Sequence, residues 1–479
     1  MSLDERKIRL EKLEKIKEQG LDPYPASFDK KNSLKEAYDA KIGTKVKTAG
    51  RLMTIRDMGK LCFCHLMDES RKMQVALKVD EIGQEGYDWF VKNLDIGDFI
   101  GVEGEVFKTH KGEISILVSK YALLTKAIRP LPEKWHGLAD EELRLRKRYL
   151  DFITHPELKE LFYRKAKFWQ VTREFLRQEG FIEVETPILE TATGGADAQP
   201  FITHHQALDI DLYLRISMGE LWQKRLMIAG FEKTFEIGRQ FRNEGMSKEH
   251  LQDYSQMECY WAYADYNEMM ALVEKMYKKI IKETYGKLKF EIAGFTVDFD
   301  KEWKKIDYVD KIKKDFDLDV TKATKEALVK KLKELRVDFD ANLSKPRLID
   351  VLWKQVRKTI AGPAFLINHP VEVSPLAKRD PKDKTKVQRF QIILAGSEMG
   401  NGYSELNDPI DQAERFKEQA KMRQAGDKEA QMYDEDFVEA LEYGMPPTAG
   451  FGFSERLFSF LENKTMRECQ IFPLMKPEK

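Results

Sequence analysis

The sequence predicts an α+β protein in which a small β-barrel precedes a larger domain built on an antiparallel sheet. The chain has 479 residues and 42% hydrophobic content, enough for two or three domains with a sizeable core. Residues 46–125 contain short β-rich runs broken by turn residues. Beyond them, helical and strand patterns are mixed without a regular βαβ order, which favours an antiparallel sheet flanked by helices.

Composition excludes several classes of protein. Lys+Arg and Asp+Glu are both 81, so the formal net charge is zero and any surface for nucleic acid must come from local segregation of charge. Four cysteines are too few for a disulfide framework in a chain of this length. The N-terminus has no apolar signal core and no run reaches membrane-spanning length, so we expect a cytoplasmic protein without a membrane partner.

The first 140 residues predict an extension, a barrel and a linker. Residues 1–45 read as a helical extension. Residues 46–128 supply five strands and a helical stretch near 83–94, for which an oligonucleotide-binding (OB) fold is the leading candidate. Residues 129–140 form a proline-bearing linker. The second domain then spans residues 141–479, with a Lys-rich helical element, appended or inserted, at about 301–360.

Cys62 and Cys64, followed by His65, raise the question of a metal site in the barrel. On a strand, the two cysteines point to one face and His65 to the other. No second ligand pair follows, so the pattern disfavours a metal ion there.

Residues 234–263 have the pattern of a long β-hairpin, because alternating residues flank a polar loop. Arg242 shares a face with other residues of the first strand, and Tyr254 and Glu258 share a face on the second. One side of the hairpin would then carry an arginine, a ring and a carboxylate. This set suits the phosphate and base of a nucleotide together with a cationic group. The alternative is an exposed polar sheet face.

Two common glycine-rich phosphate loops, GxxxxGK[ST] and a strand-linked GxGxxG, do not occur in the sequence. Near the C-terminus, however, residues 446–456 read PPTAGFGFSER. The glycines permit close backbone approach, and Arg456 opens an apolar helical run. Alone this pattern is weak, because an arginine at a helix start is more often a surface residue.

Three segments in order resemble the motifs of the class II aminoacyl-tRNA synthetases. Residues 175–190, FLRQEGFIEVETPILE, resemble motif 1, the helix and strand that build the dimer interface in that family. FRNEG at 241–245 resembles motif 2, and GFGFSER at 450–456 resembles motif 3. The resemblance covers nearly the whole chain and is most specific to the lysine-activating subfamily. It implies an OB-fold barrel, a catalytic domain on an antiparallel sheet, and a homodimer.

The resemblance implies an ATP-dependent, AMP-forming ligase. An amino-acid carboxylate attacks the α-phosphate of ATP, and the 3′ end of tRNA then takes the acyl group. Positioning and charge neutralisation carry such a reaction, so Arg242 and Arg456 are expected to be catalytic. The expected ATP-binding residues are Arg242, Glu244, His250, Tyr254, Glu398 and Arg456.

A separate set of residues matches the lysine-binding residues of the subfamily and implies that lysine is the amino acid activated. They are Glu220, Glu258, Tyr260, Asn401, Tyr403 and Glu405. Two or three carboxylates in one pocket favour a cation, and a tyrosine ring can cover an aliphatic stem. The barrel would read the anticodon of tRNA(Lys) with Arg56, Phe63, Gln74 and Glu113. Phe63 could equally belong to the barrel core, since it lies in the middle of a strand.

The sequence departs from the family at several positions. The family holds Mg²⁺ on two acidic side chains before the GNGxSE run; Glu398 supplies one, but the other position is Gln391, a weaker ligand for a hard cation. Leu251 replaces an asparagine, and motif 3 is one residue shorter than usual, with Glu455 where aspartate is commoner. The segment Ser217–Leu221 is one residue longer than in the family, and these length differences shift the alignment of Glu220 and Glu455 with the family positions.

The resulting hypothesis is a lysine-activating tRNA ligase with ATP, L-lysine and tRNA(Lys) as substrates and Mg²⁺ as cofactor. Three alternatives stay open. One is the same fold charging aspartate or asparagine, which needs a cation or an amide reader in the pocket. Another is a protein-modifying paralogue, which would lack the barrel. The third is a non-catalytic RNA-binding relative, disfavoured by Arg242 and Arg456.

Overall fold

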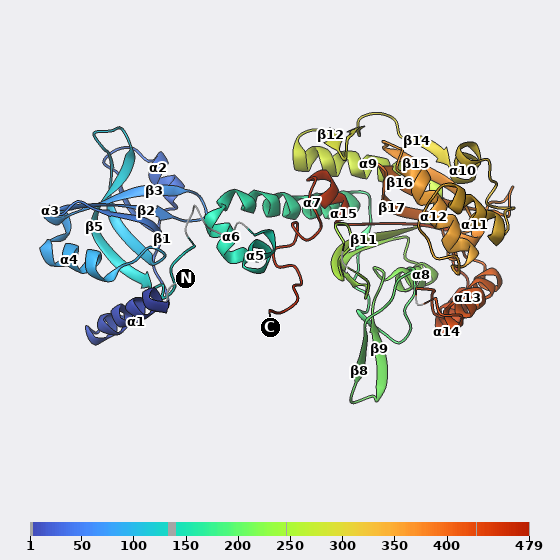
Figure 1. Ribbon diagram of the computed structural model, residues 1–479, viewed down its shortest axis with the longest axis horizontal. Coiled ribbons are helices and arrows are strands. Elements are labelled where there is room, and N and C mark those ends of the chain that lie inside the picture. Colours follow the sequence, from blue (N-terminus) through green and yellow to red (C-terminus); the bar gives the residue numbers. More distant parts are fainter. Residues whose placement is uncertain (1–2, 133–139, 246, 428, 479) are drawn as a thin grey trace. The chain divides into compact units, whose positions relative to one another are not determined.

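The computed structural model describes residues 3–132, 140–245, 247–427 and 429–478. The chain forms two compact units, Met1–Thr154 and His155–Lys479 (Figure 1). The linker predicted at 129–140 falls for the most part outside the described residues. Among the described residues, no helix is long and apolar enough to cross a membrane.

The first unit contains a closed five-stranded barrel, as the sequence predicts for an OB fold. Its strands are β1 (Lys45–Asp57), β2 (Leu61–Met67), β3 (Lys72–Lys78), β4 (Phe99–Lys108) and β5 (Ile114–Thr125). They pair in the order β1-β2-β3-β5-β4. Helices α3 (Val79–Ile82) and α4 (Gln84–Asn93) lie between β3 and β4, at the predicted helical stretch. Cys62 and Cys64 are buried in the barrel core, while His65 lies on the outer face.

Helices α1 (Leu3–Glu18) and α2 (Leu34–Asp39) precede the barrel in the chain, and the same unit also contains α5 (Glu141–Arg146) and α6 (Arg148–Thr154). Polar contacts join α1 to the barrel. The guanidinium of Arg9 donates to the carbonyl of Ile96 at 2.9 Å. Lys12 pairs with Asp95 at 2.7 Å, and Asp95 also pairs with the buried ammonium of Lys126 at 2.6 Å. The extension is therefore held on the barrel by charge-assisted hydrogen bonds together with the buried side chains of Leu34 and Ala37 of α2, which join the barrel core.

The second unit is built on an eight-stranded sheet in the order β14-β15-β16-β17-β18-β11-β10-β6. Its strands are β6 (Ile182–Glu183), β10 (Lys233–Phe241), β11 (Asp253–Ala262), β14 (Lys304–Asp307), β15 (Ala364–Pro370), β16 (Lys386–Leu394), β17 (Ser397–Ser404) and β18 (Thr448–Ser454). Only the outermost pairs, β14–β15 and β10–β6, are parallel. The predicted antiparallel sheet with flanking helices is thus confirmed.

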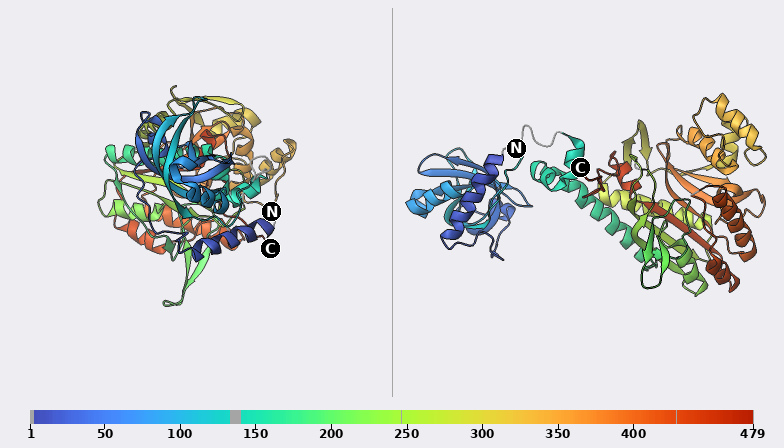
Figure 2. Two further views of the ribbon diagram at one scale, coloured as in Figure 1. Left: turned by 90° about the vertical axis from the view of Figure 1, so that its left-hand side faces the viewer. Right: turned by 60° about the horizontal axis from the view of Figure 1, so that its bottom comes forward.

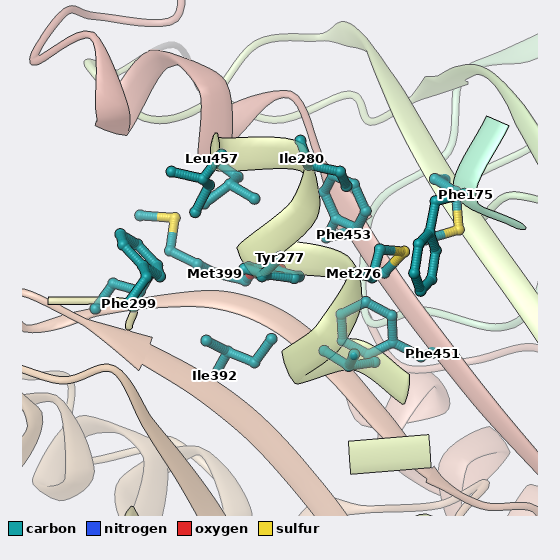
Figure 3. Close-up of a cluster of buried hydrophobic side chains, with 14 of the residues drawn as sticks. Phe175, Met276, Tyr277, Ile280, Phe299, Ile392, Met399, Phe451, Phe453 and Leu457 are labelled. Carbon is teal, nitrogen blue, oxygen red and sulfur yellow. The ribbon is translucent and has the colours of Figure 1, made fainter. Parts of the chain in front are cut away.

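One face of this sheet packs against helices α7 (Lys159–Gln178) and α9 (Tyr266–Tyr285). A capping box of Asp265 and Glu268 begins α9, and Gly286 ends it in the left-handed conformation. Figure 3 shows Met276 and Tyr277 of α9 among the rings of the central strands. Close packing of the helices on this apolar face fixes the positions of the central strands.

The other face is polar, because side chains alternate along each strand. On β18, Phe451 and Phe453 belong to the core, and the alternating glycines Gly450 and Gly452 face the opposite side. On β11, Met257 and Cys259 enter the core, while Glu258 points to the polar side. The same alternation that builds the core therefore lines a cavity on the opposite face.

Helices α10 (Tyr308–Phe316), α11 (Lys325–Glu334) and α12 (Lys345–Arg357) lie in the chain between β14 and β15 and form a hydrophobic cluster of their own. They correspond to the Lys-rich element near 301–360, which is therefore inserted between two strands of the main sheet.

The remaining elements are β7 (Leu189–Glu190), β8 (Ile202–His205), β9 (Ile210–Leu214), α8 (Glu220–Ile228), β12 (Lys289–Ile292), β13 (Phe295–Asp298), α13 (Pro409–Gln424), α14 (Glu435–Glu442) and α15 (Arg456–Leu461). The β8–β9 hairpin projects from the body of this unit in both Figure 1 and Figure 2.

Candidate active site

A cavity of about 360 Å³ opens on the polar face of the large sheet. It collects side chains from β11, β16, β17 and β18 and from the start of α8. The predicted residues that line it are Glu220, Arg242, His250, Tyr254, Glu258, Tyr260, Gln391, Glu398, Asn401, Tyr403, Glu405 and Arg456. Glu244 is half-buried nearby but is not part of the cavity wall.

The predicted hairpin is present and its register gives the expected shared face. β10 and β11 pair with Glu236 opposite Glu258 and Gln240 opposite Tyr254. Arg242 follows the end of β10, and its guanidinium carbon lies 5.8 Å from the ring centre of Tyr254. The alternative of an exposed polar face does not hold, since Glu258 is buried and its strand pairs with β18 on its other side.

The buried carboxylate of Glu258 accepts three hydrogen bonds from the protein. Its Oε1 accepts from the backbone N–H of Met218 at 3.0 Å and from Gln256 Nε2 at 2.5 Å. Its Oε2 accepts from the hydroxyl of Tyr260 at 3.0 Å. Burial, and then the negative charge of Glu220, raise the pKa of Glu258 to about 7. The group is therefore poised between its neutral and charged forms near neutral pH.

Glu220 and Glu405 form a second cluster around an ammonium group. Lys224, one turn after Glu220 on α8, lies 2.7 Å from Oε1 of Glu220 and 2.5 Å from Oε2 of Glu405. Tyr403 donates its hydroxyl to the same oxygen of Glu220. Burial raises the pKa of Glu405 well above its ordinary value, although Lys224 opposes this effect. Three buried carboxylates thus line this end of the cavity, and one buried ammonium lies against two of them.

The motif 3 glycines make room for these carboxylates. A Cβ at Gly450 would lie 2.2 Å from Oε1 of Glu405, and a Cβ at Gly452 would lie 2.8 Å from Cγ of Glu258. No other residue type fits without displacing the carboxylates. Glu455 has a structural place: it is buried, and its Oε1 accepts from the N–H of Ser255 at 3.1 Å.

The opposite end of the cavity is the expected phosphate region. Arg456 begins α15 and forms an ion pair with Glu249 of the β10–β11 loop. Burial, only partly offset by Glu249, holds the pKa of Arg456 below its ordinary value. Partial burial and the charge of Arg456 lower the pKa of His250, whose Nδ1 is 2.8 Å from Oγ of Ser247. Arg242 and Arg456, which both line the cavity, are therefore placed to meet a polyanion here.

The two side chains expected to bind the metal, Glu398 and Gln391, already form hydrogen bonds with other side chains of the protein. Glu398 accepts from Nε1 of Trp353 at 2.9 Å and from Nε2 of Gln391 at 3.1 Å. The side-chain amide oxygen of Gln391, Oε1, lies 3.0 Å from Nε2 of His369. Burial holds the pKa of His369 well below its ordinary value. Glu398 fits a single Mg²⁺ that is bound mostly by substrate phosphates and water. Gln391 fits poorly, because its oxygen already accepts a hydrogen bond.

In the first unit, the proposed anticodon readers lie on neighbouring strands of the barrel. Arg56 on β1 is paired with Phe63 on β2, and Phe63 is half-buried on the outer face rather than in the core. Gln74 on β3 donates to Glu113 at 2.9 Å. These contacts bring a ring and three polar side chains to one outer surface.

Several cavity residues were not found by sequence reasoning. Lys224 carries a usable signal, because it stands four residues after Glu220 and shares its helix face. Arg389 donates to Asn401 at 2.8 Å, and Glu249 meets Arg456 across the cavity. The contact of Arg389 with Asn401 joins the consecutive strands β16 and β17, whereas that of Glu249 with Arg456 joins distant parts of the chain and has no local signature.

Comparison with known proteins agrees with this architecture. Residues 140–476 match the family of class II tRNA synthetases (D, K and N), and residues 46–124 match the OB-fold nucleic acid binding domain. The chain belongs to the class II tRNA synthetase family and is a ligase of that class.

Among curated relatives, the chain is 46% identical to the lysine–tRNA ligase of Thermotoga sp. (strain RQ2), covering 98% of this chain and 96% of the relative. It is 45% identical to the lysine–tRNA ligase of Thermoanaerobacter pseudethanolicus, with coverage of 98% and 96%. It is 44% identical to that of Carboxydothermus hydrogenoformans, with 98% of both chains covered. The roles of single residues remain predictions.

Proposed function

We propose that this protein is a lysine–tRNA ligase that converts L-lysine and ATP to lysyl-adenylate and pyrophosphate and then esterifies the 3′ end of tRNA(Lys). The observation that carries the proposal is the cavity itself. Its inner end holds the buried carboxylates of Glu220, Glu258 and Glu405, and its other end holds two arginines. A substrate with a cationic tail and a carboxylate head fits between them.

The chemical step joins two anions, so the protein's task is to bring them together. Arg242 receives the amino-acid carboxylate and the α-phosphate, and Arg456 receives the terminal phosphate. Tyr254, whose ring faces Arg242, stacks on adenine. The rate gain comes from alignment and from positive charge placed where negative charge develops. The pyrophosphate leaves with its charge neutralised by Arg456.

A bound Mg²⁺ would neutralise part of the phosphate charge of ATP. Glu398 is the protein ligand best suited to hold it, while Gln391 keeps Glu398 in place through its amide N–H. This arrangement favours fewer protein-bound ions than a pair of acidic side chains would hold.

The other expectations concern partners and location. The outer surface with Phe63 and Gln74 would bind the anticodon bases of tRNA(Lys) by stacking and edge hydrogen bonds. A homodimer through the motif 1 region is supported by exposed apolar side chains at Ile182, Ile188 and Leu189. Because the substrate tRNA is used in translation, we place the enzyme in the cytoplasm.

Aspartate and asparagine are disfavoured by the same pocket. An aspartate side chain needs an unpaired cation, but the ammonium of Lys224 already lies between Glu220 and Glu405. An anionic side chain would therefore meet a net negative charge at close range, at a cost of several kcal/mol.

The test is ATP–pyrophosphate exchange with each of the twenty amino acids in turn, without tRNA. The proposal predicts exchange with lysine alone. Exchange with aspartate or asparagine would keep the reaction class and overturn the lysine assignment. No exchange with any amino acid would favour a non-catalytic relative.

A further inference from the structure

Lys224 brings a positive charge of the protein's own into a pocket that otherwise suits a cationic substrate. Its side chain is 1% exposed, and its ammonium lies 2.7 Å from Glu220 and 2.5 Å from Glu405. The same ammonium is 5.4 Å from the ring centre of Tyr403 and 5.9 Å from that of Phe437. Rings and carboxylates therefore surround the cation on several sides, as they would surround a bound ammonium ligand.

The charges of the pocket can be counted. Glu220, Glu258 and Glu405 contribute three negative charges when ionised, and Lys224, which pairs with two of them, contributes one positive charge, so this cluster of four side chains carries a net charge of two negative. L-lysine brings two ammonium groups, and in the proposed function its carboxylate faces Arg242. The two ammonium groups then balance the pocket.

We propose that Lys224 is a resident counter-cation and a positioning residue for lysine specificity. It sets the pocket to the charge that the two ammonium groups of lysine neutralise, and it holds Glu220 and Glu405 together before substrate binds. The inference rests on the proposed function and deepens it.

A neutral residue at position 224 would leave a third buried carboxylate without a counter-charge when lysine is bound. Such a group must keep a proton or move, and breaking a buried ion pair by removing one partner is strongly destabilising. Glu405 has little room to move, because its Oε1 lies against Gly450. The carboxylate geometry that lysine meets therefore depends on Lys224.

The charge count predicts that combining two harmful substitutions, Lys224→Met and Glu220→Gln, partly restores lysine binding. Lys224→Met alone leaves three carboxylates and no resident cation. Glu220→Gln alone leaves two carboxylates and the cation, one negative charge too few. The double variant has two carboxylates and no cation, which restores the net charge of two negative.

The experiment measures the KM for lysine and for ATP in ATP–pyrophosphate exchange for the wild type, both single variants and the double variant. Each single variant is expected to raise the lysine KM at least thirtyfold and to change the ATP KM less than threefold. The double variant is expected to have a lysine KM at least fivefold lower than either single variant. Arg225→Met is the matched control, because Arg225 is the next residue on α8 and pairs with Asp434 at 3.1 Å. Its lysine KM is expected to stay within threefold of the wild type.

A merely structural role for Lys224 would make the two substitutions add, so a double variant worse than both single variants overturns the inference. A Lys224→Met protein with unchanged lysine KM overturns it as well. If that variant does not fold, as judged by thermal unfolding, the comparison of Glu220→Gln with the double variant still decides. Absence of lysine-dependent exchange in the wild type would instead defeat the proposed function.

Discussion

Glu249 and Arg456 form an ion pair across the cavity although 207 residues separate them in the sequence. Glu249 belongs to the loop between β10 and β11, and Arg456 begins the helix after motif 3. In the proposed function Arg456 receives the terminal phosphate of ATP, so the carboxylate of Glu249 occupies the place of an anionic group. ATP must displace this carboxylate when it binds.

Glu249→Gln is therefore expected to lower the KM for ATP about threefold or more while leaving the KM for lysine unchanged. Removing the charge frees Arg456 and reduces repulsion of the triphosphate; two unit charges about 4 Å apart interact by about 1 kcal/mol in bulk water and about 4 kcal/mol near a protein surface. Steady-state ATP–pyrophosphate exchange measures both constants. A higher KM for ATP would mean that Glu249 supports ATP binding instead.

Gly450→Ala is expected to reduce lysine-dependent exchange at least thirtyfold, because the new Cβ would lie 2.2 Å from Oε1 of Glu405. Relieving such a clash typically costs about 1–3 kcal/mol and would displace the carboxylate. Gly86→Ala serves as control, since a Cβ there meets only the Cβ of Ile82 at 3.9 Å. Normal lysine kinetics in Gly450→Ala would show that Glu405 does not bind the substrate.

The raised pKa of Glu258, about 7, predicts a pH dependence of lysine binding. A bound ammonium needs the carboxylate ionised, so the KM for lysine should fall as pH rises from 6 to 8, by up to about tenfold per pH unit below the pKa. The KM for ATP should change much less. A lysine KM that is flat over this range would remove Glu258 from the binding set.

The ionisation of Glu258 also makes the free energy of unfolding depend on pH. The pKa of Glu258 is raised from 4.5 to about 7 on folding, so between these values the folded protein holds a proton that the unfolded chain has lost. Its contribution to the free energy of unfolding therefore falls as pH rises through this window. Lysine should offset the loss, so its shift of the unfolding temperature should be larger at pH 8 than at pH 6.

Phe63→Ala is expected to weaken tRNA charging by about 1–3 kcal/mol, the range for one stacked base, and to leave lysine–ATP exchange unchanged. The matched control is Phe107→Ala, another half-buried phenylalanine on a barrel strand, β4. A loss of exchange in Phe63→Ala, or equal charging defects in both variants, would contradict a role in anticodon reading.

The sequence predicts those parts of the fold that leave a local pattern, such as the alternation of side chains along a strand. Alternation over residues 234–263 predicts the β10–β11 hairpin and the residues that share a face, whereas the register comes from the structure. The barrel follows from strand-sized runs and turn residues. The insertion near 301–360 could be recognised as helical, but its place between β14 and β15 depends on strand pairing that no local pattern reveals.

The candidate site was less accessible to sequence reasoning. The resemblance to the family supplied most of the cavity residues, but not the contacts between them. Tyr403 meets Glu220 across 183 residues, and the ammonium of Lys224 joins both to Glu405. Gln391 could be noticed as an amide in place of an acid, yet its bond to His369 follows only from the pairing of β15 with β16. Such contacts arise from tertiary packing.

The central claim is that buried carboxylates select the ammonium group of the lysine side chain. The most direct test compares L-lysine with L-norleucine, which keeps the aliphatic stem and lacks the ammonium, as substrates for ATP–pyrophosphate exchange by the wild-type protein. Leaving a buried carboxylate unpaired costs about 3–5 kcal/mol, so kcat/KM for lysine should exceed that for norleucine by about a factor of several hundred or more. A ratio below ten would contradict the account.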